Sequence, residues 1–241
     1  MLKSQDSIRL GDVIPNFEAD STHGKCSLYQ VIGDKSYGLL FSHPADFTVR
    51  NYAFRRRLFF KPTITQPVCT TELATAEKYR ERFEKMNCKL AAISCDDADS
   101  HREWLKDIEI ATGVTPKYPI FADPDRKIAM KLGMLNQDHL DKKGVPLTVR
   151  KVFLIGPDRK VKLTITYPAG TGRNFDELLR VTRSVQLTAN EKLATPANWN
   201  EGEKCVCVPG LSTKDAKSSF EDFEMLDLPS GKEYMRFVST K

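Results

Sequence analysis

Short apolar runs alternate with amphipathic segments along most of the chain. Three apolar runs bounded by turn residues predict buried strands, at residues 37–42, 89–94 and 152–155. Hydrophobic residues at helical spacing predict helices, at residues 69 to about 87, 100 to about 111, 128–132 and 174 to about 189. A turn at 156–159 joins the third apolar run to a strand at 161–166. This order of strands, helices and a hairpin predicts an α/β fold with a central mixed sheet and helices on both faces.

The pattern changes beyond about Leu187, where prolines and glycines separate short pieces. Two of these pieces, residues 204–208 and 234–238, predict small strands. We therefore divide the chain into a domain of residues 1–187 and a module of residues 188–241. A module of about fifty residues is near the lower limit of independent stability. We expect it to pack on the first domain or on a partner subunit.

Composition is that of an ordinary globular protein, with 241 residues, of which 40% are hydrophobic and 29% charged. The six cysteines are sparse and form neither a Cys-x-x-Cys pair nor a Cys/His cluster, so we expect no structural zinc and no metal site. No apolar run approaches the ~18 to 20 residues of a membrane span. The polar start does not resemble a signal peptide, and we expect a cytoplasmic protein without stable membrane insertion.

One stretch, Val49 to Gln66, is strongly basic. It holds five Lys or Arg residues and no acidic residue, which accounts for the whole net charge of +5. Arg55, Arg56 and Arg57 lie between aromatic residues, a mixture that RNA or lipid surfaces can attract. The remainder of the chain is neutral, however, so we interpret the stretch as a solvated loop and expect no nucleic-acid partner.

Cys69 begins the first long amphipathic helix, directly after Pro67 and Val68. Free backbone N–H groups and the positive end of the helix dipole favour a thiolate over a thiol at such a position. The alternative is a cysteine that only packs in the core, as most free cysteines do. The proline before Cys69 and the Thr-Thr-Glu after it mark a defined helix start, which favours the nucleophile.

The segment Phe41-Ser42-His43-Pro44-Ala45-Asp46-Phe47-Thr48, together with Pro67-Val68-Cys69-Thr70-Thr71-Glu72, resembles the active-site signature of the peroxiredoxins. The version found here is that of the single-cysteine, peroxiredoxin-6-like branch. Further matches are 147–153, 156–158, 167–177 and 194–199, so the resemblance covers nearly the whole chain. It implies a thioredoxin-like fold followed by a small C-terminal peroxiredoxin module, which helps to build a homodimer in this branch.

The resemblance also implies an activity. It predicts a thiol-dependent peroxidase that reduces hydrogen peroxide and organic hydroperoxides through a cysteine sulfenic acid, with an antioxidant role and no cofactor. Cys69 is the implied nucleophile, and the Thr48 hydroxyl is expected to bond the sulfur and the peroxide. Pro44 shields them from bulk water, and the Arg150 guanidinium holds sulfur and oxygen together. Thr48 as a mere turn residue and Arg150 as a surface cation are the alternatives.

Two further residues are expected to support these groups. Glu72 would orient the guanidinium of Arg150, unless it is only a first-turn carboxylate favoured by the helix dipole. His43 is close to the sulfur in the resembling branch. We rank it as a supporting residue rather than a base.

The sulfenic acid must be reduced again. Cys205 and Cys207 are the candidates for a resolving cysteine, but they lack the Val-Cys-Pro context of two-cysteine enzymes, and both fall on the same face of a strand. Cys88 and Cys95 flank a buried strand and are expected to be inert. An external thiol such as glutathione or thioredoxin is therefore the expected reductant.

The chain departs from the family where residues 49–66 separate Thr48 from Pro67, which are adjacent in other members. This insert leaves open a catalytically impaired, peroxiredoxin-like binding or chaperone-type protein, or a mis-spliced product. Its first residue is valine, whose codons begin GT, and its last is glutamine, for which CAG is a codon. These match the usual ends of an intron, so we hypothesise that the insert is an intron retained in frame.

Overall fold

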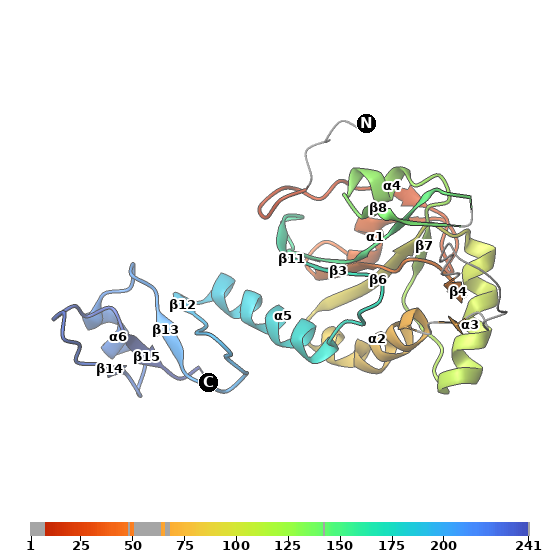
Figure 1. Ribbon diagram of the computed structural model, residues 1–241. Coiled ribbons are helices and arrows are strands. Elements are labelled where there is room, and N and C mark those ends of the chain that lie inside the picture. The colour runs from red at the N-terminus through yellow and green to blue at the C-terminus, as the bar shows by residue number, and fades with distance from the viewer. Residues whose placement is uncertain (1–7, 48, 51–63, 66–67, 142, 241) are drawn as a thin grey trace, which may run out of the picture. The chain divides into compact units, whose positions relative to one another are not determined.

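The computed structural model describes residues 8–47, 49–50, 64–65, 68–141 and 143–240 (Figure 1). The chain forms two compact units, Met1–Phe175 and Asp176–Lys241. The first unit contains a five-stranded sheet of order β11-β10-β3-β6-β7. Its strands are β3 (Tyr37–Ser42), β6 (Cys88–Ser94), β7 (Ile120–Ala122), β10 (Arg150–Ile155) and β11 (Val161–Tyr167). β3, β6 and β7 are parallel, whereas β10 runs antiparallel to β3 and to β11, so the predicted mixed sheet and its hairpin are confirmed.

Four helices accompany this sheet: α1 (Leu28–Ile32), α2 (Val68–Lys85), α3 (Ala98–Thr112) and α4 (Lys127–Lys131). α1 and α4 lie on one face, while α2 lies on the other and packs beside α3 (Figure 1). Helices on both faces are what the sequence pattern predicts for this domain. Together with the mixed sheet they confirm the thioredoxin-like architecture.

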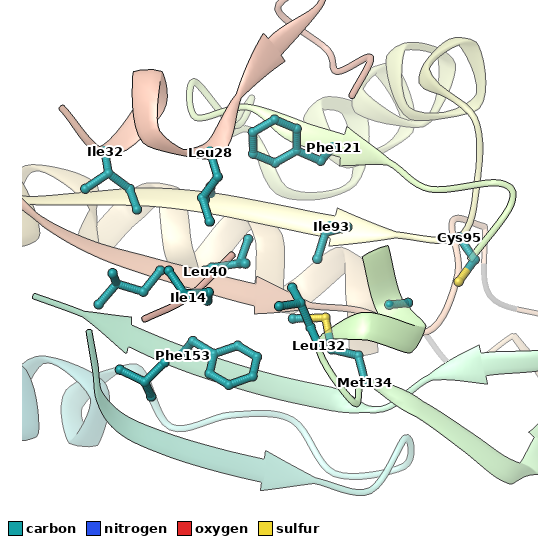
Figure 2. Packing of buried hydrophobic residues seen from close by; sticks show 14 residues of the cluster. Ile14, Leu28, Ile32, Leu40, Ile93, Cys95, Phe121, Leu132, Met134 and Phe153 are labelled. Atoms are coloured by element: carbon teal, nitrogen blue, oxygen red, sulfur yellow. The ribbon is translucent and has the colours of Figure 1, made fainter. Parts of the chain in front are cut away.

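The core between the sheet and α1 draws residues from all five strands of the sheet. Leu40, Ile93, Phe121 and Phe153 meet Leu28 and other side chains there, and all are fully buried (Figure 2). Burying a side chain of this size stabilises the fold by roughly 1.5 to 3 kcal/mol. Two of the residues described below lie at the ends of these strands, since Arg150 is the first residue of β10 and His43 follows β3.

Short pairs of strands complete the first unit. They are β1 (Glu18–Ala19) with β2 (Cys26–Ser27), β8 (Leu135–Leu140) with β9 (Pro146–Thr148), and β4 (Val49–Arg50) with β5 (Ile64–Thr65). β4 and β5 are the two ends of the insert, and Val49 lies opposite Thr65 in an antiparallel pair. The insert therefore leaves and re-enters the domain at neighbouring points.

The second unit has its own sheet and core. Its elements are α5 (Phe175–Asn190), β12 (Leu193–Ala194), β13 (Cys205–Cys207), α6 (Thr213–Ser219), β14 (Glu224–Met225) and β15 (Arg236–Val238). The strands form an antiparallel sheet of order β12-β13-β15-β14. Leu187, near the end of α5, packs with Trp199 and the β13 cysteines, which joins this helix to the module. The units accordingly divide at Phe175, upstream of the boundary at 187 expected from sequence.

Candidate active site

Cys69 is the second residue of α2, and its side chain is only 1% exposed. The helix has 18 residues, long enough for its backbone dipoles to add up at the N-terminus. At this end the backbone N–H groups have no partner within the helix. Cys69 thus lies where a negative charge is stabilised by the backbone alone.

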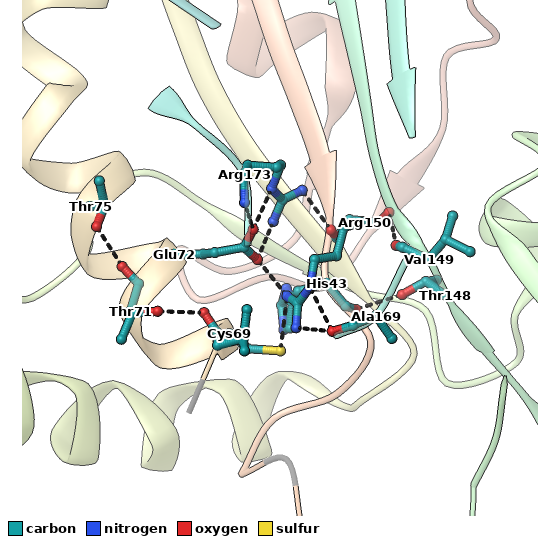
Figure 3. Close-up of polar contacts among 12 residues, drawn as sticks. His43, Cys69, Thr71, Glu72, Thr75, Thr148, Val149, Arg150, Ala169 and Arg173 are labelled. Atoms are coloured by element: carbon teal, nitrogen blue, oxygen red, sulfur yellow. Dashed lines mark hydrogen bonds and ion pairs between the residues drawn. The ribbon is translucent and has the colours of Figure 1, made fainter. Parts of the chain in front are cut away.

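Arg150, the first residue of β10, reaches the sulfur. Its Nη1 donates a hydrogen bond to Cys69 Sγ at 3.3 Å (Figure 3). The Nε and Nη2 atoms of the same guanidinium donate to the carbonyl oxygen of Ala169, at 3.0 and 2.7 Å. With three nitrogens engaged, the planar group is held in one orientation. The guanidinium is fixed against the sulfur by the backbone beyond β11.

Glu72 lies one turn after Cys69 on α2, so the two side chains share a helix face. It accepts a hydrogen bond from Arg150 Nη1. Arg173 holds the same carboxylate from the other side, through Nε to Oε1 at 2.9 Å and Nη2 to Oε2 at 2.7 Å. The backbone N–H of Arg173 adds a bond of 2.7 Å. Glu72 is therefore the shared anion of two buried guanidinium groups.

The charges of this cluster do not balance without the cysteine. Arg150, Arg173 and Glu72 are 1%, 7% and 3% exposed, and together they carry two positive charges and one negative charge. An excess charge in a buried place is costly unless an opposite charge accompanies it. A thiolate at Cys69 would provide that charge at the 3.3 Å contact with Arg150. The cluster thus places one positive charge in excess beside the sulfur.

The remaining predicted residues are placed as follows. Pro44 is buried in the loop after β3, and Thr48 lies outside the described residues. His43 is fully buried, and its backbone carbonyl accepts a hydrogen bond of 2.5 Å from Thr148 Oγ1. Its Nε2 lies 3.0 Å from Asp46 Oδ1. His43 therefore belongs to a polar network that sequence reasoning did not identify.

This network is the group among the described residues that could hold a metal ion. One ligand atom from each of His43, Asp46 and His101 lies within 4.8 Å of the others. The atoms are already in direct contact, because Asp46 Oδ2 lies 2.7 Å from His101 Nδ1. Burial alone would raise the pKa of Asp46, but the hydrogen bonds from His101 and His43 outweigh it and hold that pKa well below its usual value. Protons shared between these groups account for the contacts without an ion.

Four of the other five cysteines are buried. Cys205 and Cys207 are 0% and 2% exposed and pack with Trp199, and burial raises the pKa of both thiols. Burial also raises the pKa of Cys88 and of Cys95 to about 12. All six cysteines are free thiols.

Sequence reasoning did not assign a role to Arg173, to the Ala169 carbonyl or to Asp46 and His101. Arg173 and Ala169 both lie in the segment 167–177, which carries part of the resemblance. The place of Arg173 in that matching segment is the signal that the sequence offers, whereas its burial is known only from the structure. His101 gave no signal, since its neighbours in space lie far away in the chain.

No helix within the described ranges is both long and apolar enough to cross a membrane.

Comparison with known proteins identifies the family. Residues 56–164 match the AhpC/TSA family, and residues 184–222 match the C-terminal domain of 1-Cys peroxiredoxin. The chain is 48% identical to peroxiredoxin-6 of Gallus gallus, over 95% of this chain and 96% of that protein. It is 47% identical to 1-Cys peroxiredoxin PER1 of Triticum aestivum, over 96% and 98% of the two chains.

Two solved peroxiredoxin structures resemble this chain along nearly its whole length. A cysteine-to-serine mutant of peroxiredoxin 6 from Arenicola marina has a TM-score of 0.85 and 47% identity, over 97% of this chain and 98% of that one. A yeast mitochondrial 1-Cys peroxiredoxin has a TM-score of 0.79 and 36% identity, over 97% of this chain and 100% of that one. The chain therefore belongs to the peroxiredoxin-6-like 1-Cys peroxiredoxins, which are thiol-dependent peroxidases.

Proposed function

We propose that Cys69 is the peroxidatic nucleophile of this enzyme and that Arg150 binds the sulfur and the peroxide together. The observation that carries the proposal is the 3.3 Å hydrogen bond from Arg150 Nη1 to Cys69 Sγ, within a buried cluster of two arginines and one glutamate that has one positive charge in excess. Glu72 and Arg173 keep the guanidinium in place. The family resemblance implies that the Thr48 hydroxyl bonds the sulfur and the peroxide and that Pro44 shields them from bulk water.

In the reaction, the Cys69 sulfur donates an electron pair to the terminal oxygen of the peroxide. The S–O bond forms as the O–O bond breaks, leaving a sulfenic acid. The departing oxygen takes up the proton that the thiol had lost and leaves as water or an alcohol. Arg150 offers charged donors to the negative charge that develops on this oxygen, a fixed stabilisation of the kind that usually dominates such steps.

The reductant in this proposal is an external thiol of the glutathione or thioredoxin type. Two such thiols reduce the sulfenic acid to a thiol, giving one disulfide and one water. The yeast mitochondrial relative is described as resolved through glutathione and thioredoxin systems. The burial of Cys205 and Cys207 among apolar side chains supports an external rather than an internal partner.

The test is steady-state reduction of hydrogen peroxide and of tert-butyl hydroperoxide. Each is supplied with glutathione and glutaredoxin, or with thioredoxin and its reductase. The proposal expects turnover with at least one of the two systems, at a rate that depends on the concentration of the external thiol. A sulfenic acid that forms and is reduced by neither system would contradict this choice of reductant.

Homodimer formation and a cytoplasmic location are part of the same proposal. Met225, Leu226 and Tyr234 of the second unit are exposed apolar residues, which a partner subunit would cover. Six free thiols suit a reducing compartment. Light scattering would test the first point, since a dimer has twice the mass of the 27.3 kDa chain, and cell fractionation would test the second.

A further inference from the structure

Asp46 is the centre of a buried hydrogen-bond network beside β3. Its Oδ1 lies 3.0 Å from His43 Nε2, and its Oδ2 lies 2.7 Å from His101 Nδ1. Ser100 Oγ donates to Oδ2 at 2.8 Å. A carboxylate accepts all three contacts, whereas a protonated acid would have to donate one of them. Both histidines are fully buried, so these contacts fix their protons.

Both ring nitrogens of His101 face hydrogen-bond acceptors. Its Nε2 lies 3.2 Å from the carbonyl oxygen of Phe121, which can only accept. Its Nδ1 faces the Asp46 carboxylate, which also accepts. A ring with both nitrogens donating is an imidazolium. The pKa of Asp46, held low mainly by hydrogen bonds from the two histidines against the effect of burial, agrees with a carboxylate at this point.

His43 is in the opposite state. Its Nε2 donates to Asp46, and among the described residues its buried Nδ1 has no hydrogen-bond partner. Burial lowers the pKa of His43 and outweighs the opposing effect of Asp46, and the His101 ring, whose centroid lies 5.9 Å away, opposes a second positive charge. His43 is thus a neutral imidazole with a bare nitrogen at Nδ1.

The position of His43 connects this network to the arginine cluster. Ser42, the residue before it, accepts a hydrogen bond of 2.8 Å from Arg173 Nη1 through its carbonyl oxygen. The ring of His43 packs against Trp104 of α3, with centroids 5.2 Å apart. Packing on one side and Asp46 on the other leave the ring one orientation.

We propose that Asp46 and His101 are positioning residues of the peroxidase site, which hold His43 as a neutral imidazole with Nδ1 as a hydrogen-bond acceptor. This inference rests on the proposed function of Cys69. Peroxide and sulfenic acid each carry an O–H group that an acceptor can hold, whereas Arg150 offers only donors. The network therefore supplies a hydrogen-bond acceptor, which the guanidinium of Arg150 cannot provide.

The first test is nitrogen-15 NMR of the histidine rings in the full-length, reduced protein at neutral pH. The chain has only four histidines, so the signals can be assigned by substitution. We expect His101 to show two protonated nitrogens and His43 to show a proton on Nε2 and none on Nδ1. A bare nitrogen on His101, or a proton on Nδ1 of His43, overturns the proposal.

The second test is Asp46→Asn, which keeps the shape of the side chain. The asparagine amide presents its oxygen to one ring and its NH2 group to the other, so one ring nitrogen becomes an acceptor: either His43 Nε2, with its proton moving to Nδ1, or His101 Nδ1, which then loses its proton. We expect the NMR signature of one of the two rings to change in this way, and the rate constant for sulfenic acid formation with hydrogen peroxide to fall about ten- to hundredfold. His101→Gln should lower the rate in the same direction.

His23→Gln is the matched control, because His23 is exposed, and it should leave the rate unchanged. A folded Asp46→Asn variant that oxidises as fast as the unmodified protein removes Asp46 from the site. If the unmodified protein is oxidised rapidly in the same measurement, the proposed role of Cys69 is retained even when that of Asp46 is rejected. The proposal for Cys69 and the proposal for Asp46 can therefore fail separately. If the Asp46→Asn variant does not fold, the NMR measurement of the His43 and His101 rings in the unmodified protein still tests the proposal.

Discussion

Cys69 and the pair Cys205 and Cys207 are almost equally hidden from solvent, at 1%, 0% and 2% exposure, yet their surroundings differ in kind. Cys69 begins a long helix and accepts a hydrogen bond from the guanidinium of Arg150. Cys205 and Cys207 lie on one face of β13, packed with Trp199 and aliphatic side chains. In that setting, burial raises the pKa of both thiols.

The comparison teaches that burial by itself does not decide the chemistry of a cysteine. An apolar cavity disfavours the thiolate, and a buried cationic cluster with one charge in excess favours it. In the first unit the cluster is built from residues on three separate segments, which the sheet brings together. In the second unit the cysteines belong to the apolar core.

The largest predicted effect is that of Cys69→Ser. A hydroxyl does not ionise at neutral pH, so peroxide consumption with an external thiol should be abolished while the fold is kept. Peroxide consumption and circular dichroism measure the two parts of this prediction. Cys26→Ser, which changes a cysteine outside the cluster, should retain full activity. Full activity in Cys69→Ser would remove Cys69 from the mechanism.

Arg150→Lys retains the charge but loses the planar fork. An ammonium cannot bond the sulfur, Glu72 and the Ala169 carbonyl together. We expect the second-order rate constant with hydrogen peroxide to fall on the order of a hundredfold. Stopped-flow fluorescence or competition with a reference peroxidase measures it. Arg180→Lys, on α5 and paired with Glu177, is the control. An unchanged rate in Arg150→Lys would show that charge alone suffices.

Deletion of residues 49–66 should increase the rate. The deletion rejoins Thr48 to Pro67, and the pairing of Val49 with Thr65 shows that the ends of the insert are close enough to be joined. A misplacement of about 1 Å in a catalytic group can cost on the order of a hundredfold, so a gain of about tenfold or more is expected. Transcript sequencing should show the shorter form as the major product if the insert is a retained intron. A single, insert-containing transcript and an unimproved deletion variant would together show the insert to be a true loop.

The smallest effect is expected from the double variant Cys205→Ser, Cys207→Ser. Both thiols are buried in the C-terminal module, and the proposed cycle does not use them. Turnover with an external thiol should stay within about twofold, whereas the melting temperature should fall because a hydroxyl replaces a buried sulfur. Loss of turnover, together with loss of an intermolecular disulfide on non-reducing gels, would identify one of the two as a resolving cysteine.

Much of this fold follows from local patterns in the sequence. The strand Tyr37–Ser42 was predicted with its observed bounds, and the helix at Cys69 within a few residues, because apolar runs and helical spacing are strong signals. Family membership and peroxidase activity, inferred from the motifs, are confirmed by the relatives. The two-residue strands and α6 were not predicted, because elements this short hold too few residues to show the hydrophobic periodicity of a strand or a helix.

The site was predicted only in part, for a physical reason. The sequence named Arg150 and Glu72 through motifs, but the charge balance depends on Arg173, which lies far from both along the chain. The role of Asp46 likewise depends on His101, whose ring reaches it from α3. Contacts between distant segments leave no periodic signal, and only the folded sheet brings them together.

The most direct test of the account is the reaction of the unmodified protein with one equivalent of hydrogen peroxide in the presence of dimedone. Peptide mapping by mass spectrometry then locates the adduct. The account predicts a sulfenic acid adduct at Cys69 within seconds, and none at Cys205 or Cys207. Absence of the adduct at Cys69, or faster labelling at either buried cysteine of β13, would contradict the claim that the cationic cluster selects the reactive sulfur.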